Sequence, residues 1–334
     1  MSGLSRRQFV QSAAVAGIGL VAGCGRLPGQ AAAPPPMHRI GVLFPGSPSV
    51  QGSWYEDFRH ALRDLGHVEG QNTTLEVRYA EGQSARLPEL VGELLAAPVD
   101  VIVANSLVVA RVVKPATTTI PIVVITGDPV GAGLVSSYAH PGGNITGLSN
   151  IAPELAAKRL ELLKEAVPGI TRVAVIWNQA DQTMALEFGE TIRAAEELGV
   201  ELQSLAAREQ SGLERAYDAA VAGGADGIVV IADEFIVRSR SQIVALSARS
   251  RLPTISGDRD FAQAGGLMAY GPNRRELEYG AAYLVDKILK GAKPADLPIE
   301  RPMRFDFVVN LKTAQELGIT FPQETMMQVT EVIQ

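Results

Sequence analysis

The chain alternates short runs rich in Val and Ile with longer amphipathic stretches, and this alternation starts again halfway along its 334 residues. Residues 172–178 repeat the pattern of 39–45, where an Arg precedes an apolar run. The amphipathic stretches 50–65 and 183–198 follow these runs, and each ends in Leu-Gly. Continuous apolar strands that alternate with helices are typical of parallel sheets covered on both faces. The repeat therefore predicts two similar, doubly wound α/β lobes rather than a single core.

The tail of the chain predicts how the two lobes are joined. After the second unit it adds a helix at 274–290, a strand at 304–309 and a helix at 311–317. A tail of this kind indicates that the chain crosses between the lobes more than once, and multiple crossings form a hinge beside a cleft. We expect lobe 1 to contain 39–149 and 272–303, and lobe 2 to contain 150–271 and 304–334.

The remaining elements follow from the same pattern. The expected strands are 40–44, 74–79, 99–104, 122–125, 172–178, 201–205, 225–231 and 253–255. The other expected helices are 84–97, 107–114 and 153–167. The Gly-rich segment 141–147 predicts a tight turn that leads into a strand.

The first 23 residues have the parts of an export signal. Arg6 and Arg7 give a twin-arginine start, and an uncharged run of small and apolar residues follows. This run is about a dozen residues long, whereas a membrane-spanning helix needs about 20. Cys24, the only cysteine, follows small residues and resembles a bacterial lipobox, in which the thiol receives a lipid; a free thiol is the alternative. We expect 1–23 to be removed, 24–38 to form a lipidated tether, and the mature protein to be anchored on the periplasmic or cell-surface side of a membrane.

Composition excludes several classes of function. Removal of 1–23, which holds two arginines and no acid, moves the formal charge from −6 to −8, so nucleic acid is not an expected partner. No cysteine remains for disulfides or thiolate metal sites, and the four histidines lack metal-ligand spacing. We therefore expect no metal, no cofactor and no catalytic machinery. His60 and His67 are expected on a solvated face, as are the Arg side chains near Arg240.

The candidate ligand residues lie in the loops after the expected strands. In open α/β sheets, ligands bind beyond the carboxyl ends of the strands, where helix N-termini offer free N–H groups. These loops are rich in Ser, Asn, Asp and Gly, and the candidates are Ser47, Asn105, Ser106, Gly127, Asp128, Asn178, Asp233 and Asp258. Each of these side chains is also an ordinary helix cap or turn former, which is the main alternative. Trp54, Tyr55 and Trp177 are candidates for stacking on an aromatic ligand, with packing in the core or at the rim as the simpler interpretation.

Several segments together resemble one known family. They are residues 40–43, 65–72, 127–131, 141–147, 154–163, 265–273 and 310–314. From about Arg39 to its end, the chain resembles the ABC-transporter substrate-binding proteins of the tryptophan/tyrosine-type family, which have a type I periplasmic-binding fold. The resemblance implies capture of a small solute between the lobes and delivery to a membrane permease with its ATPase.

These observations predict a solute-binding lipoprotein of an ABC importer, not an enzyme. Its ligand is expected to be an amino acid or a related small carboxylate, captured by closure about the hinge. A sensor subunit with the same cleft and a signalling partner is one alternative. An exported enzyme is another, although the sequence offers no convergent acid, base and nucleophile.

Overall fold

The computed structural model describes residues 37–179 and 182–334, and residues 37–334 form one compact unit. Arg6, Arg7, Cys24 and most of the expected tether therefore lie outside the described residues. The first strand, β1 (His38–Phe44), begins directly after Met37. Among the described helices, none has both the length and the apolar character needed to cross a membrane.

Lobe 1 is built on a five-stranded parallel sheet with the order β2-β1-β3-β4-β5. Its strands after β1 are β2 (Thr73–Tyr79), β3 (Val101–Ala104), β4 (Ile122–Thr126) and β5 (Ile145–Ser149). Its helices are α2 (Pro48–Asp64), α3 (Leu87–Ala96), α4 (Leu107–Ala116) and, from the tail, α11 (Arg274–Leu289); η1 (Ser84–Arg86) and η2 (Pro294–Asp296) are single turns.

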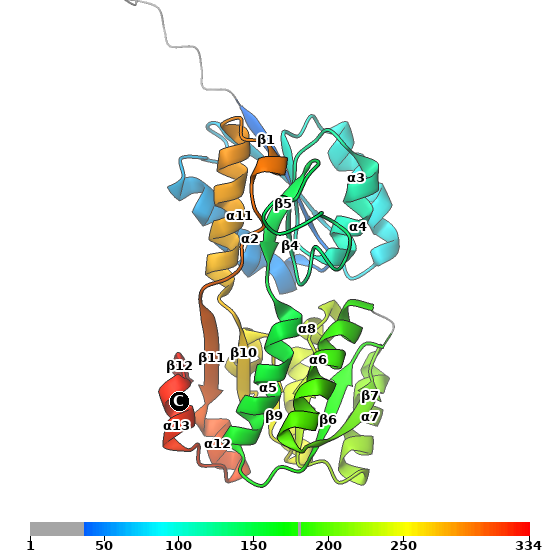
Figure 1. Ribbon diagram of the computed structural model, residues 1–334, viewed down its shortest axis with the longest axis vertical. Coiled ribbons are helices and arrows are strands. Elements are labelled where there is room, and N and C mark those ends of the chain that lie inside the picture. The colour runs from blue at the N-terminus through cyan, green and yellow to red at the C-terminus, as the bar shows by residue number, and fades with distance from the viewer. Residues whose placement is uncertain (1–36, 180–181) are drawn as a thin grey trace, which may run out of the picture. The chain divides into compact units, whose positions relative to one another are not determined.

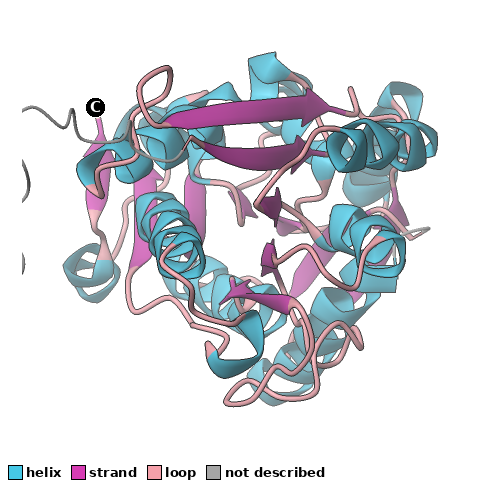
Figure 2. Cartoon of the chain, turned by 90° about the horizontal axis from the view of Figure 1, so that it is seen from above, coloured by secondary structure: helices cyan, strands magenta, loops and turns pink. Residues whose placement is uncertain are grey.

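The two faces of this sheet are covered by different helices (Figures 1 and 2). Ile40, Val42 and Phe44 pack in one core with α2 and α11, whereas Leu43 packs in the other with α3 and α4. Alternate side chains of a strand point to opposite faces, so an uninterrupted apolar strand supplies both cores.

Lobe 2 repeats this arrangement and extends it. Its sheet has the order β7-β6-β8-β9-β10-β11-β12. The strands are β6 (Arg172–Trp177), β7 (Glu201–Ala206), β8 (Gly227–Val230), β9 (Thr254–Ser256), β10 (Met268–Pro272), β11 (Phe305–Asn310) and β12 (Glu331–Ile333). The helices are α5 (Ala152–Ala166), α6 (Gln182–Leu198), α7 (Gln210–Ala222), α8 (Glu234–Arg238), α9 (Arg240–Ser250), α10 (Arg259–Gln263), α12 (Leu311–Leu317) and α13 (Gln323–Gln328).

The first five strands of lobe 2 have the same order as the sheet of lobe 1, with β6 in the place of β1. One detail is repeated as well. Asp100, just before β3, accepts a hydrogen bond from the backbone N–H of Arg39 at 2.8 Å. Asp226, just before β8, accepts one from the backbone N–H of Arg172 at 2.9 Å. Each aspartate side chain takes the place of a backbone acceptor at the start of its strand, which explains why β3 and β8 begin later than the predicted strands 99–104 and 225–231.

The chain passes between the lobes three times, after β5, after β10 and before β11 (Figure 1). The second and third crossings run side by side, because Asn273 N–H donates to the Arg304 carbonyl at 2.9 Å. The third crossing re-enters lobe 2 from the hinge end, so β11 runs antiparallel to β10. The described sheet of lobe 2 is therefore parallel except for the pairing of β11 with β10.

Candidate ligand-binding site

The strand order places a topological switch point in each sheet. The chain leaves β1 on one side toward β2, whereas β3 lies on the other side, so the loops after β1 and β3 diverge and leave a crevice. The equivalent loops in lobe 2 follow β6 and β8. Five of the eight candidate residues lie in these four loops, namely Ser47, Asn105, Ser106, Asn178 and Asp233.

The switch point of lobe 1 consists of two helix N-termini without charged side chains. Ser47 precedes α2, makes no side-chain cap, and places its Oγ 2.8 Å from Ser49 Oγ. Ser106 caps α4, because its Oγ accepts from Val109 N–H at 3.2 Å. Asn105 is buried and its Nδ2 donates to Glu278 Oε1 at 3.1 Å. Backbone N–H groups at such helix starts favour an anionic partner.

The switch point of lobe 2 is acidic. Asn178 Nδ2 donates to Asp233 Oδ2 at 2.8 Å, which joins the loops after β6 and β8. Asp233 Oδ1 accepts from Ile236 N–H at 2.8 Å and caps α8. The capping role foreseen for the candidates is thus present in Ser106 and Asp233.

Glu234, the residue after Asp233, is the functional candidate that the sequence analysis did not select. Its Oε1 is buried and has no hydrogen-bond partner among the described residues. Burial raises the pKa of its carboxyl to about 7, against the opposing effect of Arg238, and Asp233 adds to the rise. The sequence does place a second acid directly after Asp233, which could have indicated Glu234 as a candidate. A sequence does not show, however, which of two adjacent acids caps the following helix.

The two switch points lie against each other at Gly46. The Gly46 N–H donates to Gln51 Oε1 at 2.7 Å. A Cβ on Gly46 would lie 2.1 Å from Glu234 Oε1, across the boundary between the lobes. Similarly, a Cβ on Gly82, in the loop after β2, would lie 2.0 Å from Arg238 Nη1. Helix α8 of lobe 2 therefore contacts two loops at the carboxyl edge of the sheet of lobe 1, and Gly46 has no room for a side chain.

The remaining three candidates lie in loops away from the switch points. Asp128 Oδ1 accepts from Val130 N–H, Gly131 N–H and the Tyr138 hydroxyl at 3.1, 2.9 and 3.2 Å. Gly127 lies near the first crossing, where an added Cβ would be 3.6 Å from Asn150 and Pro153. These contacts are local, so nothing in the geometry of Gly127 or Asp128 points to a ligand.

Asp258 is held by a cation of its own lobe. Arg240 Nε donates to Asp258 Oδ2 at 2.8 Å, and Asp258 Oδ1 accepts from Asp260 N–H at 3.1 Å. Burial raises the pKa of the Asp258 carboxyl, while Arg240 acts in the opposite direction. The expectation that Arg240 is simply a solvated helix residue is wrong, because it is mostly buried against Asp258 and Asp260.

The expectation that His60 and His67 lie on a solvated face is confirmed for His60 and wrong for His67. His60 is exposed on α2. His67, in contrast, is buried, and its Nε2 lies 2.9 Å from Asp286 Oδ1 on α11. In the described residues, no cluster of three His, Cys, Asp or Glu side chains could hold a metal ion.

The candidate aromatic residues pack within the lobes. The Trp177 ring stacks on Phe188 with centroids 4.6 Å apart, and its Nε1 donates to Ser204 Oγ at 2.9 Å. Trp54 and Tyr55 are partly buried against the core formed with α2 and α11. Packing in the core or at the rim, the simpler interpretation, is therefore confirmed for these three residues.

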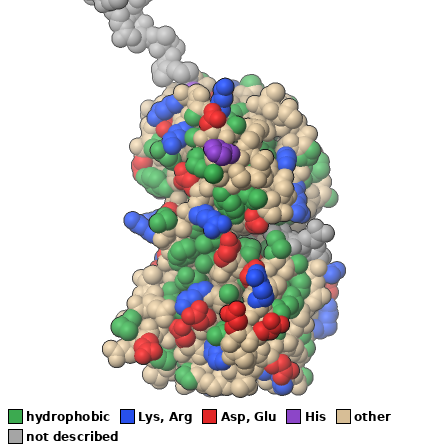
Figure 3. Space-filling view, in the orientation of Figure 1, with side chains coloured by type: hydrophobic (Ala, Val, Ile, Leu, Met, Phe, Trp, Pro, Cys, Tyr) green, Lys and Arg blue, Asp and Glu red, His purple; other side chains and the backbone are tan. Residues whose placement is uncertain are grey.

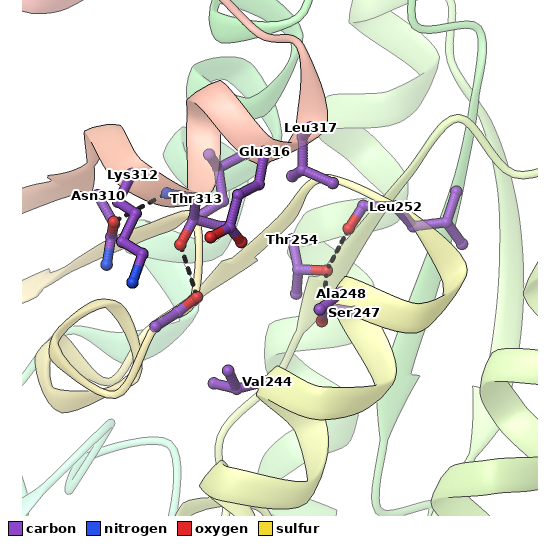
Figure 4. Close-up of a pocket in the computed structure, with 13 residues that line it drawn as sticks. Val244, Ser247, Ala248, Leu252, Thr254, Asn310, Lys312, Thr313, Glu316 and Leu317 are labelled. Carbon is purple, nitrogen blue, oxygen red and sulfur yellow. Dashed lines mark hydrogen bonds between the residues drawn. The ribbon is translucent and has the colours of Figure 1, made fainter.

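A cavity of about 200 Å³ lies elsewhere in lobe 2, between α9 and α12 (Figure 4). It borders Thr254 at the start of β9 and Leu267 just before β10, which is the edge opposite to the switch point. Three of its polar side chains are bonded within the protein: Thr313 Oγ1 donates to the Gly265 carbonyl at 2.8 Å, and Ser247 Oγ lies 3.0 Å from Thr254 Oγ1. Its position at the opposite edge of the sheet favours the switch points over this cavity as the ligand site.

On the face shown in Figure 3, Asp and Glu side chains are interspersed with Lys and Arg. Among the ion pairs of the described residues, Lys158 Nζ lies 2.8 Å from Glu161 Oε1 and 3.9 Å from Glu165 Oε1.

Comparison with known proteins connects this geometry to a family. An ABC domain from Streptococcus pneumonia, solved in complex with L-Trp, is 26% identical, with a TM-score of 0.82 over 89% of this chain and 100% of that chain. A conserved domain protein from Vibrio cholerae is 24% identical, with a TM-score of 0.83 over 89% of this chain and 99% of that chain. These similarities confirm the expected type I periplasmic-binding fold.

A tyrosine-binding protein of Clostridioides difficile is 26% identical over 263 residues, which cover 78% of this chain and 75% of that protein. The sequence model of the ABC transporter substrate binding proteins matches residues 41–333, and the chain therefore belongs to this family.

Proposed function

We propose that this protein captures an amino acid between its two lobes, outside the cytoplasm, and delivers it to an ABC permease with its ATPase. The observation that carries the proposal is the contrast between the two opposed switch points. Lobe 1 presents uncharged loops at helix N-termini, whereas lobe 2 presents Asp233 and the buried, unpartnered carboxylate oxygen of Glu234. An amino acid has one anionic and one cationic group, which suit these two surfaces.

The carboxylate of the ligand is assigned to lobe 1. The N-termini of α2 and α4 provide backbone N–H groups, and Ser47 and Ser106 provide hydroxyls beside them. Each helix start carries a partial positive charge, and no acid stands in residues 45–47 or 105–106 to oppose an anion.

The ammonium of the ligand is assigned to lobe 2, at Glu234 and Asp233. A buried carboxylate is costly unless a cation or donors compensate it, and the rise in the pKa of Glu234 reflects this cost. A ligand ammonium beside Glu234 supplies the missing partner and favours the ionised form. Binding near pH 7 should then release a proton.

Aromatic amino acids are the first ligands to test. The tyrosine-binding relative and the domain solved with L-Trp are both 26% identical to this chain. Closure follows from the same contacts, because a ligand that touches both lobes binds the closed arrangement more tightly and shifts the equilibrium toward it.

The N-terminal segment completes the proposal. Arg6 and Arg7 direct export, and lipidation of Cys24 holds the protein at a membrane beside its permease. Replacing Cys24 by Ser should abolish incorporation of labelled palmitate and release the protein from the membrane fraction. Labelled lipid on the Cys24→Ser variant would refute the anchor without affecting the ligand proposal.

The ligand proposal is tested by calorimetric titration of the purified chain with L-tryptophan, L-tyrosine, tryptamine and indole-3-propionate. The last two compounds lack the carboxylate and the ammonium, respectively. At least one amino acid should bind and be recovered unchanged, and each analogue of tryptophan should bind about 100-fold or more weakly than tryptophan itself. Equal affinity for the analogues, absence of binding by both amino acids, or chemical turnover of either would contradict the proposal.

A further inference from the structure

Glu278 is a buried acid that belongs to neither switch point. It lies in the second turn of α11 and is 2% exposed. Its hydrogen bond to Asn105 spans 173 residues of sequence and joins the tail helix to the loop after β3. No cation of the described chain forms an ion pair with it, so the Asn105 amide is its partner in place of a charge.

The surroundings of Glu278 favour the protonated acid at neutral pH. Burial raises the pKa of its carboxyl to about 8. Arg274, one turn earlier on α11, lowers this pKa, and Asp57 on α2 raises it. These two opposing groups are bonded to each other, since Arg274 Nε donates to Asp57 Oδ2 at 3.1 Å. A neutral acid is tolerated in a core at much lower cost than a charged one.

The hydrogen bond has a consequence for the orientation of Asn105. A side-chain amide is planar, so an Nδ2 that is held by Glu278 directs Oδ1 away from it. No described residue donates to Asn105 Oδ1. Asn105 is also directly followed by Ser106, the cap of α4, so its carbonyl oxygen lies at the switch point of lobe 1.

We propose that Glu278 is a positioning residue for ligand binding, which holds the Asn105 amide so that its Oδ1 accepts a hydrogen bond from the ligand ammonium. This inference rests on the proposed function. An ammonium has three N–H donors, and the acids of lobe 2 leave at least one for lobe 1. The same group of the ligand then bridges both lobes, and Glu278 determines whether lobe 1 presents an acceptor or a donor.

The test is a double-mutant cycle with L-tryptophan and L-tyrosine as probes. Asn105→Ala should weaken binding about tenfold, and Glu278→Leu should weaken it to a similar extent. The double variant should be no weaker than Asn105→Ala alone, because Glu278 acts only through Asn105. Glu278→Gln keeps an acceptor for Asn105 Nδ2 and should stay within about twofold of the wild type.

A matched control separates positioning from stability. Asp286 is a second buried acid on α11, two turns further along, and accepts from His67 instead. Asp286→Asn should lower the melting temperature and leave the dissociation constant unchanged. If Glu278→Leu does not fold, an NMR pH titration of the wild-type protein takes its place. The side-chain amide resonance of Asn105 should then shift as Glu278 ionises between about pH 6 and about pH 9.

The outcomes are distinguishable. Wild-type protein that binds neither amino acid overturns the proposed function for these ligands and this inference with it. If the wild-type protein binds and Glu278→Leu has unchanged affinity, the inference alone is overturned. The inference alone is also overturned if the losses of affinity in Asn105→Ala and Glu278→Leu add up in the double variant. An Asn105 resonance that does not move with pH also overturns it.

Discussion

The loops after β1 and β3 in lobe 1 contain no charged side chain, whereas the equivalent loops after β6 and β8 in lobe 2 bring Asp233 and Glu234 to the same edge. The strand order around both pairs of loops is identical, and the aspartates that precede β3 and β8 make the same backbone contact. The repeated unit therefore preserves the backbone framework, while the residues at the carboxyl ends of the strands differ in charge. In the proposed function, the two copies of one fold supply two different surfaces to one ligand.

Two buried acids, one in each lobe, have partners of different charge. Glu278 in lobe 1 is paired with a neutral amide, whereas Glu187 on α6 of lobe 2 is paired with Arg159 on α5 at 2.9 Å. Both partners of the second pair are nearly inaccessible, and Arg159 Nε also donates to the Tyr270 carbonyl at 2.9 Å.

The largest expected effect comes from breaking the charged pair of lobe 2. Glu187→Ala leaves the Arg159 guanidinium buried without its carboxylate and should destabilise the protein by about 3–5 kcal/mol. Chemical denaturation of the variant and the wild type measures this difference. Glu190→Ala, which removes the partner of the exposed Arg193 on the same helix, is the control and should change stability by less than about 1 kcal/mol. Equal losses for the two variants would mean that the buried pair contributes no more to stability than a solvent-accessible pair.

The next effect tests the acidic surface of lobe 2. Glu234→Gln should weaken amino-acid binding by about 30-fold or more, because the ligand ammonium loses a buried charged partner. In the wild type, a pKa of about 7 means that Glu234 becomes ionised as the pH rises. Affinity should then increase about tenfold between about pH 6 and about pH 8, and Glu234→Gln should lose this dependence. A variant that keeps the pH dependence would assign the ammonium to another group.

A smaller effect tests the contact between the lobes. Gly46→Ala places a Cβ 2.1 Å from the present position of Glu234 Oε1, so it should cost about 1–3 kcal/mol when the lobes are in contact and weaken binding about tenfold. Gly52→Ala in α2 is the control, since a Cβ there meets nothing within 4 Å. That control should leave affinity unchanged and raise stability by up to about 1 kcal/mol. Calorimetric titration measures the affinity of both variants, and thermal unfolding measures their stability. Equal affinities would show that Gly46 does not contribute to ligand binding.

The smallest effect on ligand affinity concerns the neutral acid of lobe 1, because Glu278→Gln should change affinity by no more than about twofold and should act on the pH dependence of stability instead. The pKa of Glu278 rises from its ordinary value of 4.5 to about 8, so the folded state keeps a proton that the unfolded state loses. Stability from this group therefore falls as the pH rises from about 4.5 to about 8. Glu278→Gln removes this dependence, and its melting temperature relative to the wild type should increase across that range. Parallel curves for the two proteins would show that Glu278 does not bind a proton more tightly in the folded state.

The framework of both lobes was predictable from the sequence because it depends on local patterns. Apolar runs and amphipathic stretches identified β1, β6 and the helices that follow them, and Leu-Gly pairs indicated where these two helices end. The short helix α8 and the edge strand β12 lack such patterns and were not predicted. The antiparallel direction of β11 depends on where the third crossing enters lobe 2, which no local pattern records.

The candidate site was predictable only in its loops. Ser47, Asn105, Ser106, Asn178 and Asp233 follow from the rule that ligands bind beyond strand ends. Glu234 and Glu278 required the structure, because their roles depend on burial and on contacts between distant segments. A Glu on an amphipathic helix is ordinarily a solvated residue, so the sequence of α11 alone does not reveal a buried acid.

We propose that lobe 1 binds the carboxylate of an amino acid and lobe 2 binds its ammonium. A crystal structure of the protein with bound L-tryptophan or L-tyrosine would show the orientation of the ligand and so tests this proposal. The ligand carboxylate should lie at the N-termini of α2 and α4, and the ligand ammonium should lie within hydrogen-bond distance of Glu234 or Asp233. A ligand in the reverse orientation, or one that occupies the cavity between α9 and α12, would contradict it.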